Sequence, residues 1–327
     1  MIRIGLLGAS TMGRVHALAY AGMPGAKVVG VYSRDAARAA AVAAICGAEA
    51  CTDPALLIYD DDIDAIDVCL PTPVHAEHVL AALRARKDVF CETPFALCLR
   101  DAYTMQDAAR EARRLLQVGL LMRSVAAYQH VKNATESGSH GRLLSVAAWR
   151  LGSYLRPESP GRKAHYGEPS LELMTFDFDF VHWLMGRPAT LTASAVQTAN
   201  GPGEISTVLN YEDGRHATVT ASGLMPVAFP FTVGFRALFE RAVFEHSSVF
   251  DKDGPPTSRF TIADESGARP VAVQDRNPYQ VELQHFIECV AGVADPHLLA
   301  IEAAIESLVF STATQMSLEE KRPIELD

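Results

Sequence analysis

The residues Ile2-Arg3-Ile4-Gly5-Leu6-Leu7-Gly8-Ala9-Ser10-Thr11-Met12-Gly13-Arg14-Val15-His16 decide the fold of this chain. A short apolar run breaks at Gly8 and is followed by an Ala/Leu-rich helical pattern to about Gly22. This order predicts a strand, a tight glycine turn and a helix. Backbone N–H groups and the helix N-terminus then point at one place, and that place suits a diphosphate.

The spacing of this turn is close to the dinucleotide fingerprint. Gly8 and Gly13 take the first and third glycine positions, and Ser10 takes the middle one, where its hydroxyl can add a donor. The same turn is also compatible with another kind of α/β protein. The residues predicted to hold the dinucleotide here are Gly8, Ser10, Thr11, Met12 and Gly13.

The second predicted strand, Lys27 to Tyr32, ends where a ribose-reading residue belongs. NAD-binding proteins place an acid there, whereas this chain has Ser33-Arg34. A hydroxyl followed by a guanidinium suits a 2′-phosphate, which favours NADP(H) over NAD(H). The alternative is that Arg34 lies free on the surface and Asp35 reaches the ribose.

Composition excludes several classes of protein. The 327 residues are 49% hydrophobic and 21% charged, as in an ordinary globular protein with room for two domains. A net charge of −10 without a basic cluster argues against nucleic acid or an acidic membrane as partner. No apolar segment has the length of a membrane span, and no leader is evident, so a cytoplasmic location is expected.

Residues up to about 124 alternate between predicted strands and helices, which indicates a doubly wound parallel sheet and a first domain of residues 1–124. The strand Ala65 to Leu70 ends at Pro71-Thr72-Pro73, and the strand Lys87 to Cys91 is followed by Glu92-Thr93. Such strand ends lie at the carboxyl edge of the sheet, where ligands of open α/β sheets bind.

Possible metal ligands in the chain have simpler interpretations. Six scattered cysteines without CxxC spacing are expected to be reduced core thiols. The run Asp60-Asp61-Asp62 with Asp64 is typical of a solvated loop. His75 and His78 share a helix face but have no third ligand nearby, so helix capping or surface exposure is favoured over metal binding.

From about residue 125 the pattern changes to long β-rich segments with a few helices, which predicts a second domain, residues 125–327, of the α+β class. Glu212-Asp213-Gly214-Arg215 is a hairpin signal. Hairpin-linked strands imply a large, open, mostly antiparallel sheet with helices on one face. The other face would be bare, which favours a homodimer or homotetramer.

As a set, four segments resemble the glucose-fructose oxidoreductase, inositol dehydrogenase and rhizopine-catabolism (Gfo/Idh/MocA) family. They are the turn from Gly8 to Gly13 with His16, then 70–75, 87–94 and 179–186. The resemblance covers nearly the whole chain and implies a nicotinamide cofactor on the Rossmann domain, a small-molecule substrate on the second domain, and dimers or tetramers. It adds cofactor contacts from Ser33, Arg34, Pro71, Thr72, His75, Glu92 and Thr93.

The resemblance weakens at the catalytic positions. Family members that oxidise sugar or polyol hydroxyls carry Glu-Lys-Pro, and the lysine corresponds to Thr93 here. They also carry an acid and, four residues later, a histidine, which correspond to Glu172 and Phe176. Neither threonine nor phenylalanine can accept the hydroxyl proton. The remaining candidates for this role are Glu172, His165, Tyr166, Asp177 and Tyr154.

Three functions remain open. In the favoured one the chain transfers hydride and another group, such as a desolvated Glu172, handles the proton. Glu172 could instead be a salt-bridged or helix-face carboxylate. In the second, the chain binds dinucleotide without redox chemistry, as a sensor or partner subunit. In the third, the cofactor serves transiently in elimination, hydrolysis or epimerisation.

The segment from Arg150 to Glu168 is predicted to be a substrate-contacting loop, because it is long, polar and rich in Gly and Pro. Arg162 and Lys163 suggest a carboxylate or phosphate on the substrate, although solvated surface charge is an equal alternative. Arg123 is a further candidate.

Overall fold

The chain, described by a computed structural model over residues 1–155, 169–251, 256–273 and 276–326, forms two compact units. The first is Met1–Ser124 with Arg276–Ile305, and the second is Val125–Asp275 with Glu306–Asp327. We expected residues 276–305 in the second domain. They belong instead to the first unit, because α9 (Pro278–Val290) packs on α1 (Thr11–Tyr20).

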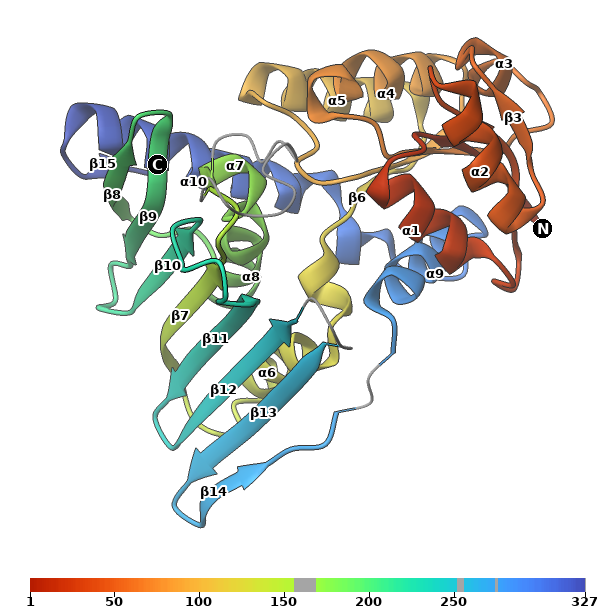
Figure 1. Ribbon diagram of the computed structural model, residues 1–327. Coiled ribbons are helices and arrows are strands. Elements are labelled where there is room, and N and C mark those ends of the chain that lie inside the picture. Colours follow the sequence, from red (N-terminus) through yellow and green to blue (C-terminus); the bar gives the residue numbers. More distant parts are fainter. Residues whose placement is uncertain (156–168, 252–255, 274–275, 327) are drawn as a thin grey trace. The chain divides into compact units, whose positions relative to one another are not determined.

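The first unit is built on a parallel sheet, as predicted, and its strand order is β3-β2-β1-β4-β5-β6 (Figure 1). Its strands are β1 (Ile2–Leu7), β2 (Ala26–Tyr32), β3 (Glu49–Cys51), β4 (Ala65–Val68), β5 (Asp88–Cys91) and β6 (Leu116–Val118). The helices between them are α1, α2 (Ala36–Cys46), α3 (Ala55–Ile58), η1 (Thr72–Val74), α4 (His75–Arg84) and α5 (Leu99–Ala112). The strand order reverses between β1 and β4, and ligands of such sheets bind beyond the carboxyl ends at that point.

The central strands are apolar because helices cover both faces of a parallel sheet. Ile4 and Leu6 of β1 and Val89 of β5 are fully buried. Each strand is short and ends at a turn, so the residues after β1, β4 and β5 are delivered to one edge. The fold therefore places the predicted cofactor residues together without any long-range signal in the sequence.

The second unit is built on a sheet of order β14-β13-β12-β11-β7-β10-β9-β8-β15. The pairing of β7 with β10 is parallel and the other pairings are antiparallel, which confirms the mostly antiparallel prediction. The strands are β7 (Leu143–Leu151), β8 (Thr190–Thr198), β9 (Gly201–Asn210), β10 (His216–Ser222), β11 (Phe231–Phe239), β12 (Ala242–Phe250), β13 (Thr257–Asp264), β14 (Gly267–Pro270) and β15 (Ile324–Glu325).

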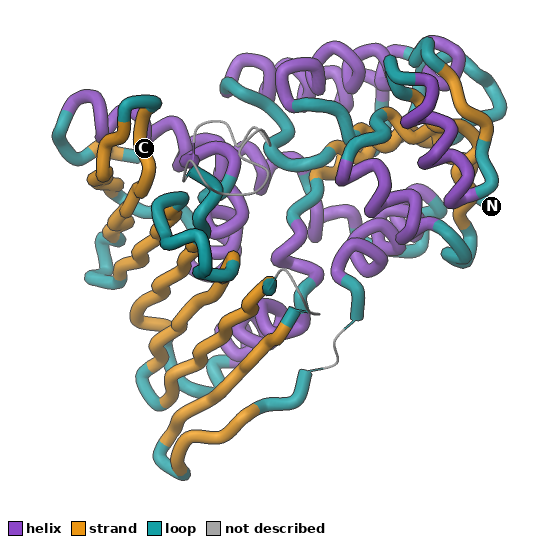
Figure 2. Tube along the Cα trace, viewed as in Figure 1, coloured by secondary structure: helices purple, strands orange, loops and turns teal. Residues whose placement is uncertain are grey.

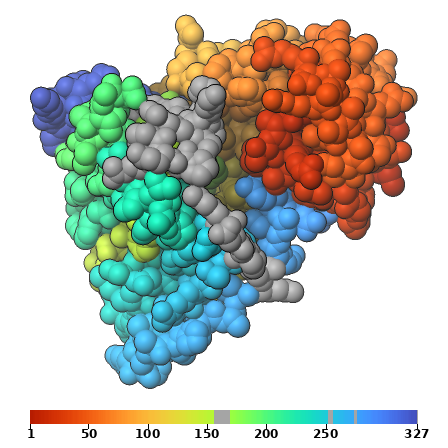
Figure 3. All heavy atoms as spheres, viewed as in Figure 1, coloured from red at the N-terminus to blue at the C-terminus, as the bar shows by residue number. Residues whose placement is uncertain are grey.

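Helices α6 (Ala126–Ser137), α7 (Pro169–Glu172) and α8 (Thr175–Met185) lie on one face of this sheet (Figure 2). Tyr128 of α6 packs edge-on against Phe180 of α8 and Phe235 of β11, with ring centroids 4.5 and 4.7 Å apart. Strands β10 to β13 lie in front of α6 and α8 in Figure 1, so their other face is turned toward the viewer there and in Figure 3.

Several helix and strand limits differ from those predicted. The sequence from Leu171 to Met185 has a helical pattern throughout but forms two helices, α7 and α8, and the helical pattern from Pro296 to Leu318 forms η3 (Pro296–Leu299) followed by α10 (Ile301–Glu320). The short edge strands β14 and β15 were not predicted, because two to four residues carry no periodic signal. In the described part of the chain no helix is both long and apolar enough to cross a membrane.

Candidate functional site

The glycine turn after β1 has the geometry that the sequence predicts. Gly8 has φ +127°, and a Cβ there would collide with the Cys69 carbonyl. A Cβ on Gly13 would collide with the Gly8 carbonyl. Only glycine fits at either place, so the turn brings β1, β4 and the start of α1 into contact.

The N-terminus of α1 is available to a ligand. Ser10 is the N-cap residue, but its side chain makes no capping hydrogen bond and is exposed. Arg14 N–H, which bonds Ser10 O at 3.0 Å, begins the helical ladder, so the amides of Thr11, Met12 and Gly13 precede it. This cradle of amides and one free hydroxyl fits a diphosphate.

The residues after β2 separate into two roles. Asp35 caps α2, because its Oδ1 accepts from Ala37 N and Arg38 N at 3.0 and 3.1 Å. Ser33 Oγ accepts from Asp35 N at 3.2 Å, and Arg34 is exposed. Asp35, the acid that could have reached a ribose, is thus engaged in capping α2, while Arg34 lies on the surface.

The carboxyl ends of β4 and β5 bring the remaining cofactor candidates to the same sheet edge. Thr72 begins η1 and is half-buried, and Pro71 is exposed. His75 is buried, so the expected capping or surface position is wrong for it: Nε2–H donates to Leu70 O at 2.6 Å. Burial lowers the pKa of His75, so the ring is neutral. His78 Nδ1–H instead donates to Val74 O at 2.9 Å.

Thr93 is tied to its surroundings. Its Oγ1–H donates to Gly119 O and its N–H donates to Glu92 Oε2, both at 2.9 Å. The hydroxyl is therefore occupied by a backbone carbonyl.

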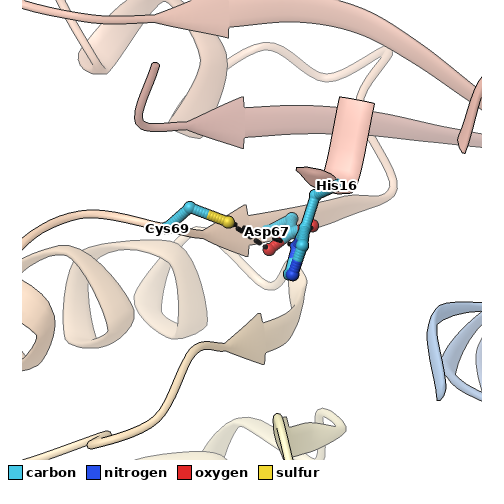
Figure 4. A group of neighbouring side chains, drawn as sticks. All are labelled: His16, Asp67 and Cys69. Carbon is cyan, nitrogen blue, oxygen red and sulfur yellow. Dashed lines mark hydrogen bonds and ion pairs between the residues drawn. The ribbon is translucent and has the colours of Figure 1, made fainter. Parts of the chain in front are cut away.

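A buried charged cluster lies directly beneath this edge (Figure 4). His16 of α1 bonds Asp67 of β4 through Nδ1 at 2.8 Å and Glu92 through Nε2 at 2.7 Å. Cys69 Sγ is 3.2 Å from the same Nδ1 and donates to Asp67 Oδ1 at 3.5 Å. His16 and Glu92 stand out in the sequence as parts of motifs, but their contact with Asp67 could not be predicted, because Asp67 lies inside a strand.

The six cysteines are free thiols, as expected, but only two of them are buried. Cys69 and Cys91 are buried free thiols, and Cys46, Cys51, Cys98 and Cys289 are free and half-buried. Asp60, Asp61, Asp62 and Asp64 are exposed, as expected of a loop.

Asp177 of the second unit lies in an ion pair and is not a free base. It is fully buried, and Arg150 donates to both of its oxygens, Nε to Oδ2 at 2.9 Å and Nη2 to Oδ1 at 3.2 Å. The Arg150 guanidinium also lies 4.6 Å from the centre of the Phe176 ring. Arg150 is thus part of β7 and of this ion pair, not of a substrate loop.

Glu172, at the end of α7, is half-buried, and burial raises the pKa of its carboxyl group. Tyr154 is half-buried. His165 and Tyr166, with Arg162 and Lys163, lie outside the described residues. Arg123, which belongs to the first unit, is buried and donates from Nη1 to Leu298 O at 2.9 Å. Among the candidates that the structure describes in this unit, Glu172 is the carboxylate that remains half exposed.

Comparison with known proteins agrees with this geometry. Residues 2–120 match the model of an oxidoreductase family with an NAD-binding Rossmann fold, and residues 128–242 match the GFO/IDH/MocA C-terminal domain. The chain is 30% identical to 1,5-anhydro-D-fructose reductase of Ensifer adhaerens, over 97% of this chain and 95% of that protein. It is 26% identical to scyllo-inositol 2-dehydrogenase (NAD(+)) of Bacillus subtilis (strain 168), over 100% of this chain and 96% of that protein.

A solved oxidoreductase from Agrobacterium radiobacter, in complex with NAD+, L-tartaric acid and magnesium, has the same fold. It superposes with a TM-score of 0.85 at 19% identity, covering 99% of this chain and 98% of that one. The glycine turn, the parallel sheet that carries it and the matches over both halves agree: the chain belongs to the Gfo/Idh/MocA family and is an oxidoreductase with a nicotinamide-dinucleotide-binding Rossmann domain.

Proposed function

We propose that this chain transfers hydride between NADP(H) and a sugar, polyol, or hemiacetal- or aldehyde-type small molecule. The bound nicotinamide supplies the hydride chemistry. The single observation that carries the proposal is the glycine cradle at the N-terminus of α1. Its proposed cofactor contacts are Gly8, Ser10, Thr11, Met12, Gly13, Ser33, Arg34, Pro71, Thr72, His75, Glu92 and Thr93.

The preference for NADP(H) rests on the residues after β2. Asp35 is committed to capping α2, and the exposed Arg34 with Ser33 can meet a 2′-phosphate. The Bacillus subtilis relative is named for NAD(+), so this preference would distinguish the two proteins.

Glu172 is the proposed proton acceptor. Asp177 is paired to Arg150, the Thr93 hydroxyl is bonded to Gly119 O, and Phe176 has no proton to exchange. A carboxylate that burial makes more basic accepts a hydroxyl proton more readily near neutral pH. His165 and Tyr166 remain further candidates from the sequence.

The Glu172 assignment is tested by Glu172→Gln, with Glu212→Gln as the control because Glu212 is an exposed carboxylate of the same unit. Loss of a general base lowers kcat by ~10²–10⁴-fold. Because the base must be ionised, alcohol oxidation by the wild type rises with pH through a pKa above the usual ~4.3 of glutamate. Glu172→Gln removes this rise; a variant that keeps wild-type kcat and pH profile contradicts the assignment.

The overall function is tested with polyols, sugars and aldehydes, by following the absorbance of reduced nicotinamide. Turnover with at least one substrate class, faster with NADP(H), is expected. The loss of the family lysine and histidine favours one second candidate, a dinucleotide-binding sensor or partner subunit. Tight binding without turnover over the panel would support that candidate, and product formed with unchanged cofactor would support a lyase or epimerase.

We also propose that the chain works in the cytoplasm as a homodimer or homotetramer. The sheet face away from α6 and α8 carries Val208 of β9 and Leu238 of β11, which are 39% and 38% exposed. Exposed apolar side chains on a sheet face are suitable contacts for a second subunit.

A further inference from the structure

A fifth titratable group, Glu282, completes the buried cluster that His16, Asp67, Cys69 and Glu92 form beneath the cofactor edge. α1 supplies His16, β4 supplies Asp67, the end of β5 supplies Glu92, and α9 supplies Glu282. Glu282 is 1% exposed. One ligating atom each of His16, Glu92 and Glu282 can be chosen so that all three lie within 4.8 Å of one another.

His16 is doubly hydrogen-bonded to carboxylates. Since carboxylate oxygens can only accept, both ring nitrogens donate, and the ring is an imidazolium. Burial lowers the pKa of His16, but the charges and hydrogen bonds of Asp67 and Cys69 outweigh it and raise the pKa well above its ordinary value. The cluster therefore holds one positive charge.

Glu282 differs from the other two carboxylates. Both of its oxygens are buried and neither has a hydrogen-bond partner within the described chain. If all three carboxylates were ionised, one imidazolium would leave two negative charges without compensation in a site closed to water. Burying an unpaired charge is so costly that such groups bind a proton instead.

The surroundings of α9 supply the other charges. The groups whose charges act on Glu282 are Glu92, His16 and Asp67, and the Tyr20 hydroxyl of α1 is a further buried neighbour. The remaining charged or titratable groups on elements packed against α9 are Arg14 of α1, Arg123 of η2 (Leu121–Ser124) and His297 of η3. Burial, with the Glu92 and Asp67 charges, raises the pKa of Glu282 well above its ordinary value, while His16 opposes this.

We propose that Glu282 is a neutral carboxylic acid in the folded protein and is a positioning residue for the Glu92–Thr93 turn. One Glu282 oxygen lies within 4.8 Å of a Glu92 carboxylate oxygen, and in the proposal the acid O–H closes this gap as a hydrogen bond. Glu92 already accepts hydrogen bonds from His16 Nε2–H and Thr93 N–H, and the proposed bond from Glu282 would be the third. No covalent bond is made or broken, and the proposed contact is an O–H···O hydrogen bond. The positioning role rests on the proposed function, because Glu92 and Thr93 are proposed cofactor contacts. The protonation of Glu282 does not rest on it.

The protonation state is tested on the full chain by infrared difference spectroscopy of wild type against Glu282→Gln at neutral pH. A carboxylic acid C=O band that shifts in D2O and is missing in Glu282→Gln is expected. Glu288→Gln is the matched control, since Glu288 is a carboxylate of the same helix bonded to Gln284. A carboxylate band in place of the acid band, or one equivalent of tightly held metal by elemental analysis, would overturn the proposal.

Thermal unfolding gives a second readout. A proton that the folded state retains and the unfolded state releases makes the wild type lose stability as pH rises above ~4.3. Glutamine mimics the acid but does not titrate, so Glu282→Gln gains melting temperature relative to wild type between pH 5 and pH 8. A difference that is the same at both pH values contradicts the neutral acid.

Cofactor affinity tests the positioning role. Glu282→Leu removes the donor and is expected to weaken NADPH binding by about tenfold, the equivalent of one hydrogen bond. Glu282→Gln, which keeps a donor, is expected to restore most of this loss. Equal affinity of all three proteins refutes the positioning role. If the wild type itself binds no dinucleotide, the proposed function fails, and the infrared and melting experiments still decide the state of Glu282.

Discussion

Gly13 lies where an added side chain would disturb the proposed dinucleotide site. A Cβ there meets the Gly8 carbonyl, so Gly13→Ala must open the turn or shift α1. We expect NADPH affinity to fall by at least about tenfold, as loss of one amide contact would do. Fluorescence titration measures it, with Leu18→Ala as control because Leu18 is an exposed residue of the same helix. Unchanged affinity would show that the turn does not hold the cofactor.

The proposed preference for NADP(H) depends on Arg34. Its guanidinium is exposed, and Asp35 is occupied with α2. Arg34→Ala is expected to weaken NADPH by about tenfold, the strength of one charge-assisted contact, and to leave NADH affinity nearly constant. The neighbouring Arg38→Ala, which removes an exposed pair with Asp35, is the comparison. If Arg34→Ala weakens both dinucleotides equally, the 2′-phosphate assignment is wrong.

These local features could be predicted because they depend on neighbours in the sequence. Gly8 and Gly13 are five residues apart, and the Ser33–Arg34 pair directly follows its strand. The role of Glu282 could not be predicted in this way, because its neighbours His16, Asp67 and Glu92 come from three other elements. Only the packing of α9 on α1 brings them together.

Asp177, one of the predicted catalytic groups, is held in an ion pair between β7 and α8. Asp177 was a candidate base from sequence position alone, and the pairing with Arg150 depends on how a strand and a helix pack. Removing one partner leaves a buried charge unpaired, so Asp177→Ala is expected to cost about 3–5 kcal/mol of unfolding free energy.

Denaturant unfolding measures the cost of Asp177→Ala. Replacing both partners with apolar residues, as in Arg150→Met with Asp177→Leu, should recover most of the loss. A single variant as stable as wild type would show that the pair does not hold β7 and α8 together.

Parallel and antiparallel sheets were predicted with different success. Each βα unit of the first sheet is marked by a short apolar strand and a turn, and β1, β2, β4 and β5 lie near their predicted places. In the second sheet the order of strands and the parallel pairing of β7 with β10 depend on contacts distant in sequence, so only the class was predictable.

The buried cluster makes the stability of the protein depend on pH. His16 has a raised pKa in the folded state, so its contribution is complete below about pH 6.5 and is lost as pH rises through the folded-state pKa. Glu282 acts in the same direction. The melting temperature of the wild type is therefore expected to fall progressively from pH 6.5 into the alkaline range, and scanning calorimetry across that range would contradict the account if the melting temperature were constant.

Assembly is tested at the open face of the second sheet. Val208→Asp with Leu238→Asp places charges on β9 and β11 where the side chains are now apolar and exposed. Light scattering is expected to show a smaller assembly than wild type, while Glu212→Gln leaves it unchanged. A wild-type chain that is monomeric at high concentration would refute the proposed oligomer.

Binding of a dinucleotide to the amides around Ser10 and Met12 underlies every function proposed for this chain. Isothermal calorimetry of the wild type with NADPH and NADH measures this. We expect one site per chain, with tighter binding of NADPH and a rise in melting temperature for both. No heat and no melting shift with either dinucleotide would contradict the account.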